Sequence, residues 1–561
     1  MFHPAPRLVI PSRRHGPASK FRNAAAAAAA VAGALAGLCA LAPALGAQTD
    51  APIAYTITFP KLAAHVARVQ ARIPTDGQPA IEMMMAEWTP GYYRTVNFAA
   101  GVDSVSATAP DGSPLTVQRT RANHWRVETG GAPSITLSYR VKAAQRSAIG
   151  NWVGDTLVVL NGAPTFMTPV GGQTRAATVA LTLPSGWSSM TSLDSASDRA
   201  PNQYQAANFD ELLDAPIVAG NLQTVQFDVA GRTHMLVDAG AVDDFSGERG
   251  GRALLRLVVE TQRFWGFLPY KRYVFLNLFR AGHDGMGHGA SSLLTTSAKG
   301  TASLDGFENW LAAAGRGYFR AFDGARLHPT DAGPADYEVP PVTPSLWITD
   351  GLGIYYGDLL VARAGLARPQ DWLGWMSQLI ANVQGAAGRK VQPLSSASLD
   401  AWKLPAAAPD MNSAKTVSFS AKGAVVGFLL DAHIRTVTKG ARSLDDVMRA
   451  AYSTFAGPTG YTPQEFQALV SQVADTDVTD WFRNALDTTK ELDYQEMLDW
   501  YGFRFAQSGN HLEYWTLEEV DKPTPEQLQH QRDILRADTA PLPPGALVPA
   551  IPVKPDTSRL R

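Results

Sequence analysis

The spacing of apolar residues changes once along this chain, and that change constrains the fold more than any other feature. Over residues 51–233, short segments carry apolar residues at every second position, as Ile135, Leu137 and Tyr139 do, and are separated by Gly, Pro, Asn and Asp. After residue 243 the apolar residues recur at spacings of three and four. Period two is typical of half-buried antiparallel strands, and the longer period is typical of helices. The sequence therefore predicts a β-sandwich followed by a mostly helical domain.

Local signals mark where some elements begin and end. Ser443 with Asp446 resembles a helix N-cap with an acid at the third position, and the run from Thr462 to Glu465 has a capping Thr, a Pro and a Glu in the order that starts a helix. Pro110-Asp111-Gly112 predicts a turn between two strands. A last helix is expected over residues 525–537, before a Pro-rich end.

The first 47 residues have the pattern of a secretory signal peptide. They hold five basic residues and no acidic one, an apolar run over residues 24–41, and small residues near residue 47. We therefore expect a periplasmic or secreted protein, with an uncleaved membrane anchor as the alternative. Cys39 is the only cysteine, so the cleaved chain would have no disulfide, thiolate metal site or cysteine nucleophile.

Charge and hydropathy exclude two other classes of protein. The 561 residues have a formal net charge of −2 and no block of Lys or Arg, which excludes a basic surface for nucleic acid. Beyond the N-terminus no apolar run approaches about 18 residues, so no membrane span is expected after signal cleavage. The expected domains are the signal peptide (1–47), the β-sandwich (48–238), the helical domain (239–505) and a Pro-rich tail (506–561).

Six short phrases, in order along the chain, resemble those of metallopeptidase family 61, the glycyl aminopeptidase type. They comprise residues 88–92, 211–216, 346–356, 422–423, 429–435 and 443–449. The resemblance implies an α+β fold in which the β-sandwich precedes a thermolysin-like, mostly helical peptidase-type domain. It also implies a zinc aminopeptidase. The family usually ends in a PDZ domain, for which the segment after Phe505 is too short, so that domain is expected to be missing.

The residues that would carry the family's chemistry are replaced. The family binds zinc with H-E-x-x-H and a later Glu, and the Glu of the motif activates water. The aligned residues here are Arg316, Gly317 and Arg320, with Asp350 at the later position. A guanidinium has no lone pair for a metal, and at ~6 Å and an effective dielectric of ~20 each Arg would repel a divalent cation by about 5 kcal/mol. We therefore expect no zinc and no other cofactor.

Two further phrases are altered at positions that the family uses. The run from His283 to Ser291 resembles a substrate-edge segment in which Gly287 replaces an acid, and Phe419 and Ser420 replace two tyrosines that could stabilise an oxyanion. No catalytic position is intact, Gly317, Phe419 and Ser420 being the degenerate ones. The candidate residues of a remaining substrate cleft are Gly285, Gly287, His288, Ser291, Arg316, Arg320, Tyr355 and Tyr356.

Several alternatives remain open from sequence alone. Arg316 and Arg320 could bind a carboxylate, or they could neutralise Asp350 and Asp323 within a filled cleft. The leading hypothesis is a non-catalytic relative of a zinc aminopeptidase that binds peptides or protein segments. The second is an active peptidase with a metal site relocated to His283 and His288, and the third is a pure protein-interaction module.

Overall fold

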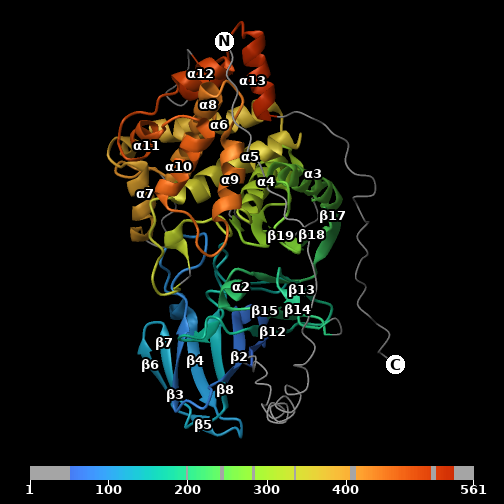
Figure 1. Ribbon diagram of the computed structural model, residues 1–561. Coiled ribbons are helices and arrows are strands. Elements are labelled where there is room, and N and C mark those ends of the chain that lie inside the picture. Colours follow the sequence, from blue (N-terminus) through green and yellow to red (C-terminus); the bar gives the residue numbers. More distant parts are fainter. Residues whose placement is uncertain are drawn as a thin grey trace, which may run out of the picture. The chain divides into compact units, whose positions relative to one another are not determined.

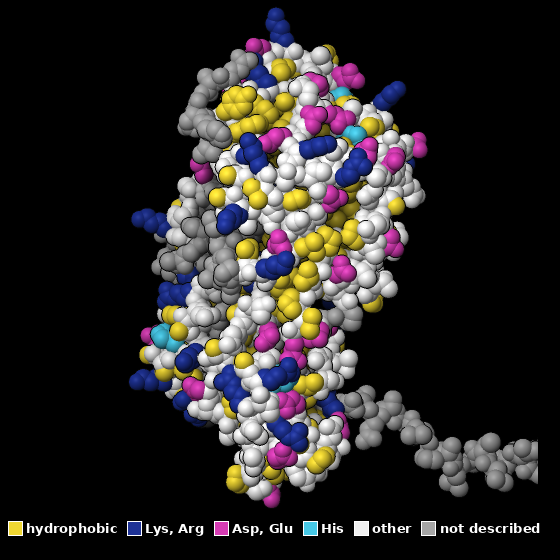
Figure 2. Space-filling view, turned by 90° about the vertical axis from the view of Figure 1, so that its left-hand side faces the viewer, with side chains coloured by type: hydrophobic (Ala, Val, Ile, Leu, Met, Phe, Trp, Pro, Cys, Tyr) yellow, Lys and Arg dark blue, Asp and Glu magenta, His cyan; other side chains and the backbone are white. Residues whose placement is uncertain are grey.

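The computed structural model describes residues 51–197, 200–240, 245–280, 285–333, 336–404, 412–506 and 513–535. The predicted signal peptide, His283 and the Pro-rich end beyond residue 535 lie outside these ranges. Within the described ranges, no helix combines the length and the apolar character needed to cross a bilayer. On the face shown in Figure 2, acidic and basic side chains are interspersed among the described residues.

The first region is a β-sandwich, as its period-two pattern predicts. A sheet in the order β14-β15-β12-β1-β2-β8-β4-β5 and a second in the order β11-β3-β7-β6 share one apolar core. Inward residues alternate along β8, where Ile135, Leu137 and Tyr139 are buried. The predicted turn joins β4 to β5, with Gly112 at a φ of 86°.

The strands of the sandwich and the sheet that packs on it have the following bounds. They are β1 (Ile53–Thr58), β2 (Val66–Pro74), β3 (Ala80–Met85), β4 (Val102–Thr108), β5 (Pro114–Leu115), β6 (Val117–Arg121), β7 (His124–Glu128), β8 (Ser134–Lys142), β9 (Trp152–Val153), β10 (Leu157–Leu160), β11 (Met167–Pro169), β12 (Ala177–Thr182), β13 (Ser188–Met190), β14 (Asp194–Ser195), β15 (Gln203–Ala206) and β16 (Ile217–Gly220). One pair departs from the antiparallel prediction, because β1 and β12 are parallel. Alternation reports which face of a strand is buried and carries no information on strand direction.

A five-stranded sheet connects the sandwich to the helices. Its order is β17 (Gln223–Val229), β18 (Arg232–Gly240), β19 (Arg272–Phe279), β21 (Ser291–Thr296) and β20 (Gly285–Gly287). Apolar residues of β18, β19 and β21 share a core with β10 and β16 of the sheet β13-β16-β10-β9. Helix α3 (Gly247–Trp265) lies along β17 and β18 (Figure 1).

The domain boundary expected after residue 238 falls inside β18, which pairs along its whole length with β19. We therefore place the boundary between β16 and β17, at residues 221–222. The sequence pattern missed this boundary because β17 and β18 alternate in the same way as the sandwich strands. Strands of two adjacent sheets cannot be told apart by periodicity alone.

The helices of the second region agree with the predicted 3–4 spacing. They follow the short α2 (Phe209–Leu213) and α3: α4 (Leu304–Phe319), α5 (Gly353–Arg363), α6 (Pro369–Gly385), α7 (Leu394–Asp400), α8 (Phe419–Val437), α9 (Leu444–Phe455), α10 (Pro463–Ala474), α11 (Thr479–Leu486), α12 (Gln495–Tyr501) and α13 (Pro525–Leu535). A π-helical turn, η5 (Trp347–Leu352), leads into α5, and β22 (Phe503–Phe505) pairs with β23 (Leu517–Glu519). Both predicted caps form: the Ser443 amide donates to Asp446, and the Thr462 amide donates to Glu465.

Candidate functional site

Helix α4 carries the residues that align with the zinc-binding motif. The helix starts at the N-cap Ser303, whose hydroxyl accepts a hydrogen bond from the Gly306 amide. Its far end packs closely on β20 and β21. A Cβ atom on Gly317 would lie 3.1 Å from the Cβ of Ser292, and one on Gly287 would lie 2.3 Å from the Gly317 carbonyl oxygen. The close approach of helix and strand therefore requires glycine at residue 287 and leaves little room for a side chain at residue 317.

Arg316 forms a two-pronged ion pair with Asp358 on α5. Its Nε donates to Oδ1 at 2.8 Å and its Nη2 donates to Oδ2 at 2.7 Å. The carboxylate is fully buried, whereas the Arg316 side chain is 41% exposed. Gly357 permits this approach, since a Cβ there would come within 2.6 Å of the Arg316 amide nitrogen. Burial raises the pKa of Asp358 above its usual value, and the charge of Arg316 opposes that rise.

Arg320 lies between the sandwich and the π-helical turn. Its Nη1 donates to the hydroxyl of Tyr93 at 3.2 Å, and Tyr93 belongs to the loop that follows β3. Asp350 interacts electrostatically with both side chains. Thr349 donates to Asp350 Oδ2 at 3.0 Å, which orients that carboxylate. The Arg320 guanidinium thus serves as a local cation for Asp350.

Asp323 adds a buried acid beside this group. The residue is fully buried, and neither of its carboxylate oxygens has a hydrogen-bond partner among the described residues. Burial raises the pKa of Asp323 well above its usual range, the negative charge of Asp350 adds to the rise, and Arg320 opposes it. Burial therefore favours the neutral form of the Asp323 carboxyl over its charged form.

A cavity of about 690 Å³ remains where the altered motifs meet. Seven of the residues singled out from the sequence line it: Gly285, Gly287, Arg316, Gly317, Arg320, Asp350 and Ser420. The first two belong to β20, the edge strand of the five-stranded sheet. The structure therefore brings together four segments, from β20, α4, η5 and the start of α8, that are far apart in the sequence.

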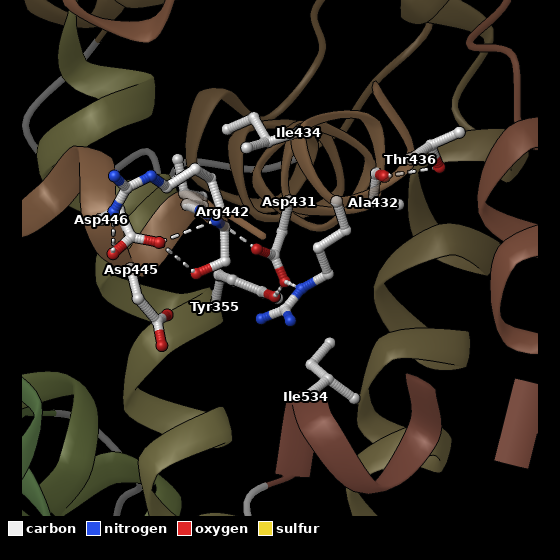
Figure 3. A network of polar contacts seen from close by, with 12 residues as sticks. Tyr355, Asp431, Ala432, Ile434, Thr436, Arg442, Asp445, Asp446 and Ile534 are labelled. Atoms are coloured by element: carbon white, nitrogen blue, oxygen red, sulfur yellow. Dashed lines mark hydrogen bonds and ion pairs between the residues drawn. The ribbon is translucent and has the colours of Figure 1, made fainter. Parts of the chain in front are cut away.

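Tyr355 and Tyr356, expected in the cleft, belong instead to the buried interior. Both are fully buried, and neither lines the cavity. Tyr355 donates to Asp431 Oδ2 at 3.1 Å, and Tyr356 donates to Asp445 Oδ1 at 3.2 Å. Figure 3 shows Tyr355 and Asp431 directed toward one another. Both tyrosines lie on α5, on a face that meets α8 and α9.

Three more candidates also lie away from the cavity. His288 is buried, and its Nδ1 lies 2.8 Å from Asp214 Oδ1. Ser291 is fully buried at the start of β21. Phe419 is buried and packs edge-on against Tyr93. None of these three lines the cavity.

Sequence reasoning missed Asp358, Tyr93 and Thr349. One of the two alternatives was that Arg316 neutralises Asp350 or Asp323, yet its partner is Asp358, a little beyond Tyr356 on the same helix. An acid on a helix that is otherwise apolar is the signal that could have revealed Asp358. Tyr93 directly follows the phrase at residues 88–92, but nothing local indicates that it reaches a helix so far along the chain.

The residues present do not fit the zinc ion that the resemblance implies. Arg316 and Arg320 have no free lone pair for a metal, and both carry positive charge. Their side chains are already engaged by Asp358 and Tyr93. In the part of the chain that the structure describes, no group of three or more His, Cys, Asp or Glu is arranged to hold a metal ion. His283, invoked for a relocated site, lies outside the described residues.

Two protein-family models match this chain. The model of the peptidase M61 N-terminal domain matches residues 54–221, and the model of M61 glycyl aminopeptidase matches residues 311–426. Together they cover just over half of the sequence. The chain belongs to peptidase family M61. No curated protein matches its sequence.

Solved structures agree with the M61 fold. An aminopeptidase N family protein from Idiomarina loihiensis is similar with a TM-score of 0.75 and 24% identity, over 80% of this chain and 78% of that one. A mutant M1 zinc metallopeptidase from Deinococcus radiodurans, bound to a Tyr-Ser-Ala substrate, is similar with a TM-score of 0.50 and 14% identity, over 79% of this chain and 94% of its own. These likenesses establish the fold, a β-rich region followed by a thermolysin-like helical domain.

Proposed function

We propose that this M61 protein is a non-catalytic relative of the zinc aminopeptidases that binds peptide segments. The main supporting observation is the pair of arginines at the C-terminal end of α4. Arg316 is held by Asp358, and Arg320, which caps the helix, is held by Tyr93, at the positions that the resemblance assigns to zinc ligands. Gly317, which stands where the family has its general base, offers no side chain to activate water. We also propose that the protein needs no metal or other cofactor.

The cavity supports the retention of peptide binding. Its lining includes the edge strand β20, and an edge strand presents backbone groups to which an extended peptide can pair. Its volume of about 690 Å³ lies within the usual range of ligand pockets. Arg316 is neutralised by Asp358, so peptide binding through the β20 backbone is better supported than anchoring of a carboxylate.

The N-terminal pattern supports export to the periplasm or to the outside of the cell. We propose that cleavage near residue 47 releases the mature chain. Mass spectrometry of the protein from separated cell fractions tests this proposal. A mature N-terminus close to residue 48 in the periplasm or medium supports it, and an intact N-terminus in the membrane fraction supports the anchor instead.

Metal content and peptidase activity test the absence of catalysis. We expect far less than one zinc per purified chain, and no release of N-terminal Gly or Ala from peptides, with or without added zinc. One zinc per chain with chelator-sensitive hydrolysis overturns the proposal. The variant R316H/R320H/D350E is the positive control, because it restores nitrogen and oxygen ligands at the same positions. Its failure to gain zinc would show that these residues do not stand at ligand positions.

Hydrogen exchange tests peptide binding at β20. A pool of hexapeptides blocked at both ends is expected to slow amide exchange over residues 285–296. Ala313 is exposed and lines the cavity, so Ala313→Trp should fill the space and abolish the protection. Ala468→Trp, at an exposed position on α10, is the matched control and should leave the protection intact. Protection that is absent, or equal in the two variants, contradicts the proposal.

A further inference from the structure

We infer that a second cavity, of about 500 Å³, binds a cationic group of a ligand, an ammonium or guanidinium such as that of a Lys or Arg side chain. Gly91, Thr349 and Arg320 line both this cavity and the larger one, so the Arg320 side chain forms part of the wall between them. The inference goes beyond the proposed function, since it concerns a different cavity and does not require peptide binding along β20.

Aromatic rings form much of the wall. Trp88 packs 5.0 Å from Tyr337 and 5.7 Å from Trp402, measured between ring centroids, and Trp402 lies 5.9 Å from Tyr93. The two indole nitrogens donate to the backbone oxygens of Asp336 and Pro341, which fixes both ring orientations. An aromatic ring face attracts a cation, most strongly where water is displaced. Rigid rings of this kind suit a cationic group with an apolar stem.

Carboxylates give the cavity an excess of negative charge. Asp210, Glu211 and Asp214 line it, and the first two are exposed. Asp214 accepts hydrogen bonds from the Gly289 amide and from His288, so it is already engaged. Asp210 interacts with the Tyr337 hydroxyl and Glu211 with the Ala207 amide, but both donors are neutral, so these two exposed carboxylates keep the negative charge that can attract a cation.

The one arginine in the lining does not cancel this charge. Arg320 donates to the Tyr93 hydroxyl and interacts with Asp350, which lines the larger cavity. Glu211 accepts a hydrogen bond from the Ala207 amide, a neutral donor that leaves its negative charge in place. The balance of charge on the lining is therefore negative.

The cavity also accounts for two sequence phrases that the proposed function leaves unused. Trp88, Pro90 and Gly91 come from the phrase at residues 88–92, and Glu211 and Asp214 come from the phrase at residues 211–216. The two phrases are far apart in the sandwich region of the sequence, yet they line one cavity. The aromatic wall and the acidic lining thus arise from separate segments that the fold brings together.

Calorimetric titration of the full chain with two capped tripeptides tests the inference. One carries lysine as its middle residue and the other norleucine, between alanines, and both have an acetyl and an amide end. We expect the lysine peptide to bind at least tenfold more tightly, with an affinity that falls as salt is added. The double variant D210N/E211Q should reduce that preference to less than threefold. Both replaced side chains are exposed, and D155N, an exposed acid outside the cavity, is the matched control.

The outcomes separate this inference from the proposed function. A lysine preference that is lost in D210N/E211Q and kept in D155N and in Ala313→Trp supports the inference, even if peptide protection at β20 fails. Equal affinity for the two peptides, or binding of neither, overturns it. So does a preference that survives D210N/E211Q, falls equally in D155N, or disappears when Ala313→Trp fills the larger cavity.

Discussion

Two groups of Arg, Asp and Tyr side chains each include residues of α5. The two groups differ in their access to water. In the interior, Arg363 donates to Asp445 at 2.9 Å, with the two side chains 0% and 1% exposed. At the cavity, Arg316 pairs with the equally buried Asp358 but is itself 41% exposed. An Arg–Asp ion pair is therefore fully buried in the interior, whereas at the cavity the arginine of a similar pair is part of the lining.

The interior network joins several helices, and its Asp and Arg side chains are buried. Asp431 accepts from Tyr355, from Arg435 and from the Leu444 amide, and Asp445 accepts from Tyr356 and Arg363. Figure 3 shows Asp431 and Asp445 on their separate elements, with Ile534 of α13 nearby. The two groups contain the same residue types, so residue type alone does not identify the candidate cleft. The exposure of the side chains to the cavity distinguishes the two groups.

The largest expected effect is in the interior. Asp445→Ala leaves Arg363 buried without its partner, and breaking a fully buried ion pair costs about 3–5 kcal/mol of unfolding free energy. Urea denaturation measures the loss. Asp480→Asn, which breaks the exposed Arg483–Asp480 pair, is the control and should cost about 0.5 kcal/mol or less. Similar losses in the two variants would contradict the distinction between sealed and exposed pairs.

Removal of the cavity-side arginine should cost less. Arg316→Ala is expected to lower the unfolding free energy by about 2 kcal/mol, because water can reach the space that the half-exposed side chain leaves. The pKa of Asp358, already raised by burial, would rise further without Arg316. A raised pKa in the folded state means that stability falls as pH rises, so the deficit should be larger at pH 8 than at pH 5.

The control for Arg316→Ala is the double variant R316A/D358N, which removes the unpaired charge. It should recover most of the stability and lose the pH dependence. A deficit of R316A that does not change with pH, or that the double variant fails to reduce, would show that Asp358 does not need its partner.

The unpartnered acid next to the cavity should respond in the opposite direction. Asp323→Asn is expected to raise the unfolding free energy by about 1 kcal/mol at pH 8, since a buried carboxyl with a raised pKa favours folding only at low pH. The gain should shrink as pH falls toward the ordinary aspartate pKa. Urea denaturation at pH 5 and 8 measures it; a loss of stability at pH 8 would mean that the carboxylate has a partner in solution.

The smallest expected losses of stability come from removing one of two tyrosine hydroxyl groups, that of Tyr355 or that of Tyr93. Tyr355→Phe removes a fully buried hydrogen bond to Asp431 and should cost about 1 kcal/mol, whereas Tyr93→Phe removes a contact to the partly exposed Arg320 and should cost about half as much. Thermal denaturation of both variants compares them. A larger loss for Tyr93→Phe would show that the Arg320 contact holds the sandwich and the helical region together more strongly than the geometry indicates.

Sequence reasoning recovered those parts of the fold that depend on local pattern. Alternation along β8 and the caps at Ser443 and Thr462 follow from neighbouring residues, and all three form as predicted. The boundary expected at residue 238 falls inside β18, and β1 and β12 are parallel where an antiparallel pair was expected, because both features depend on which strands pair. Periodicity gives the buried face of each element and not its neighbour.

Sequence reasoning also predicted only some of the residues that line the cavity. The family resemblance implies that Arg316 and Arg320 replace ligand residues and that Gly317 replaces the general base, and all three line the cavity. Tyr355 and Tyr356 were assigned to the cleft from their place in a phrase, but the helix turns them into the interior. A phrase fixes the order of residues, whereas the face of a helix that meets solvent depends on the packing of other helices.

The sequence by itself determined the two-part architecture, membership of a peptidase family and the absence of lone-pair donors at the motif, because these follow from periodicity, order and side-chain chemistry. Only the tertiary structure decided that Arg316 pairs with Asp358, that Arg320 reaches Tyr93, and that a cavity remains beside them. Those contacts join segments that are far apart in the sequence. Their geometry depends on the packing of whole elements, which no local pattern encodes.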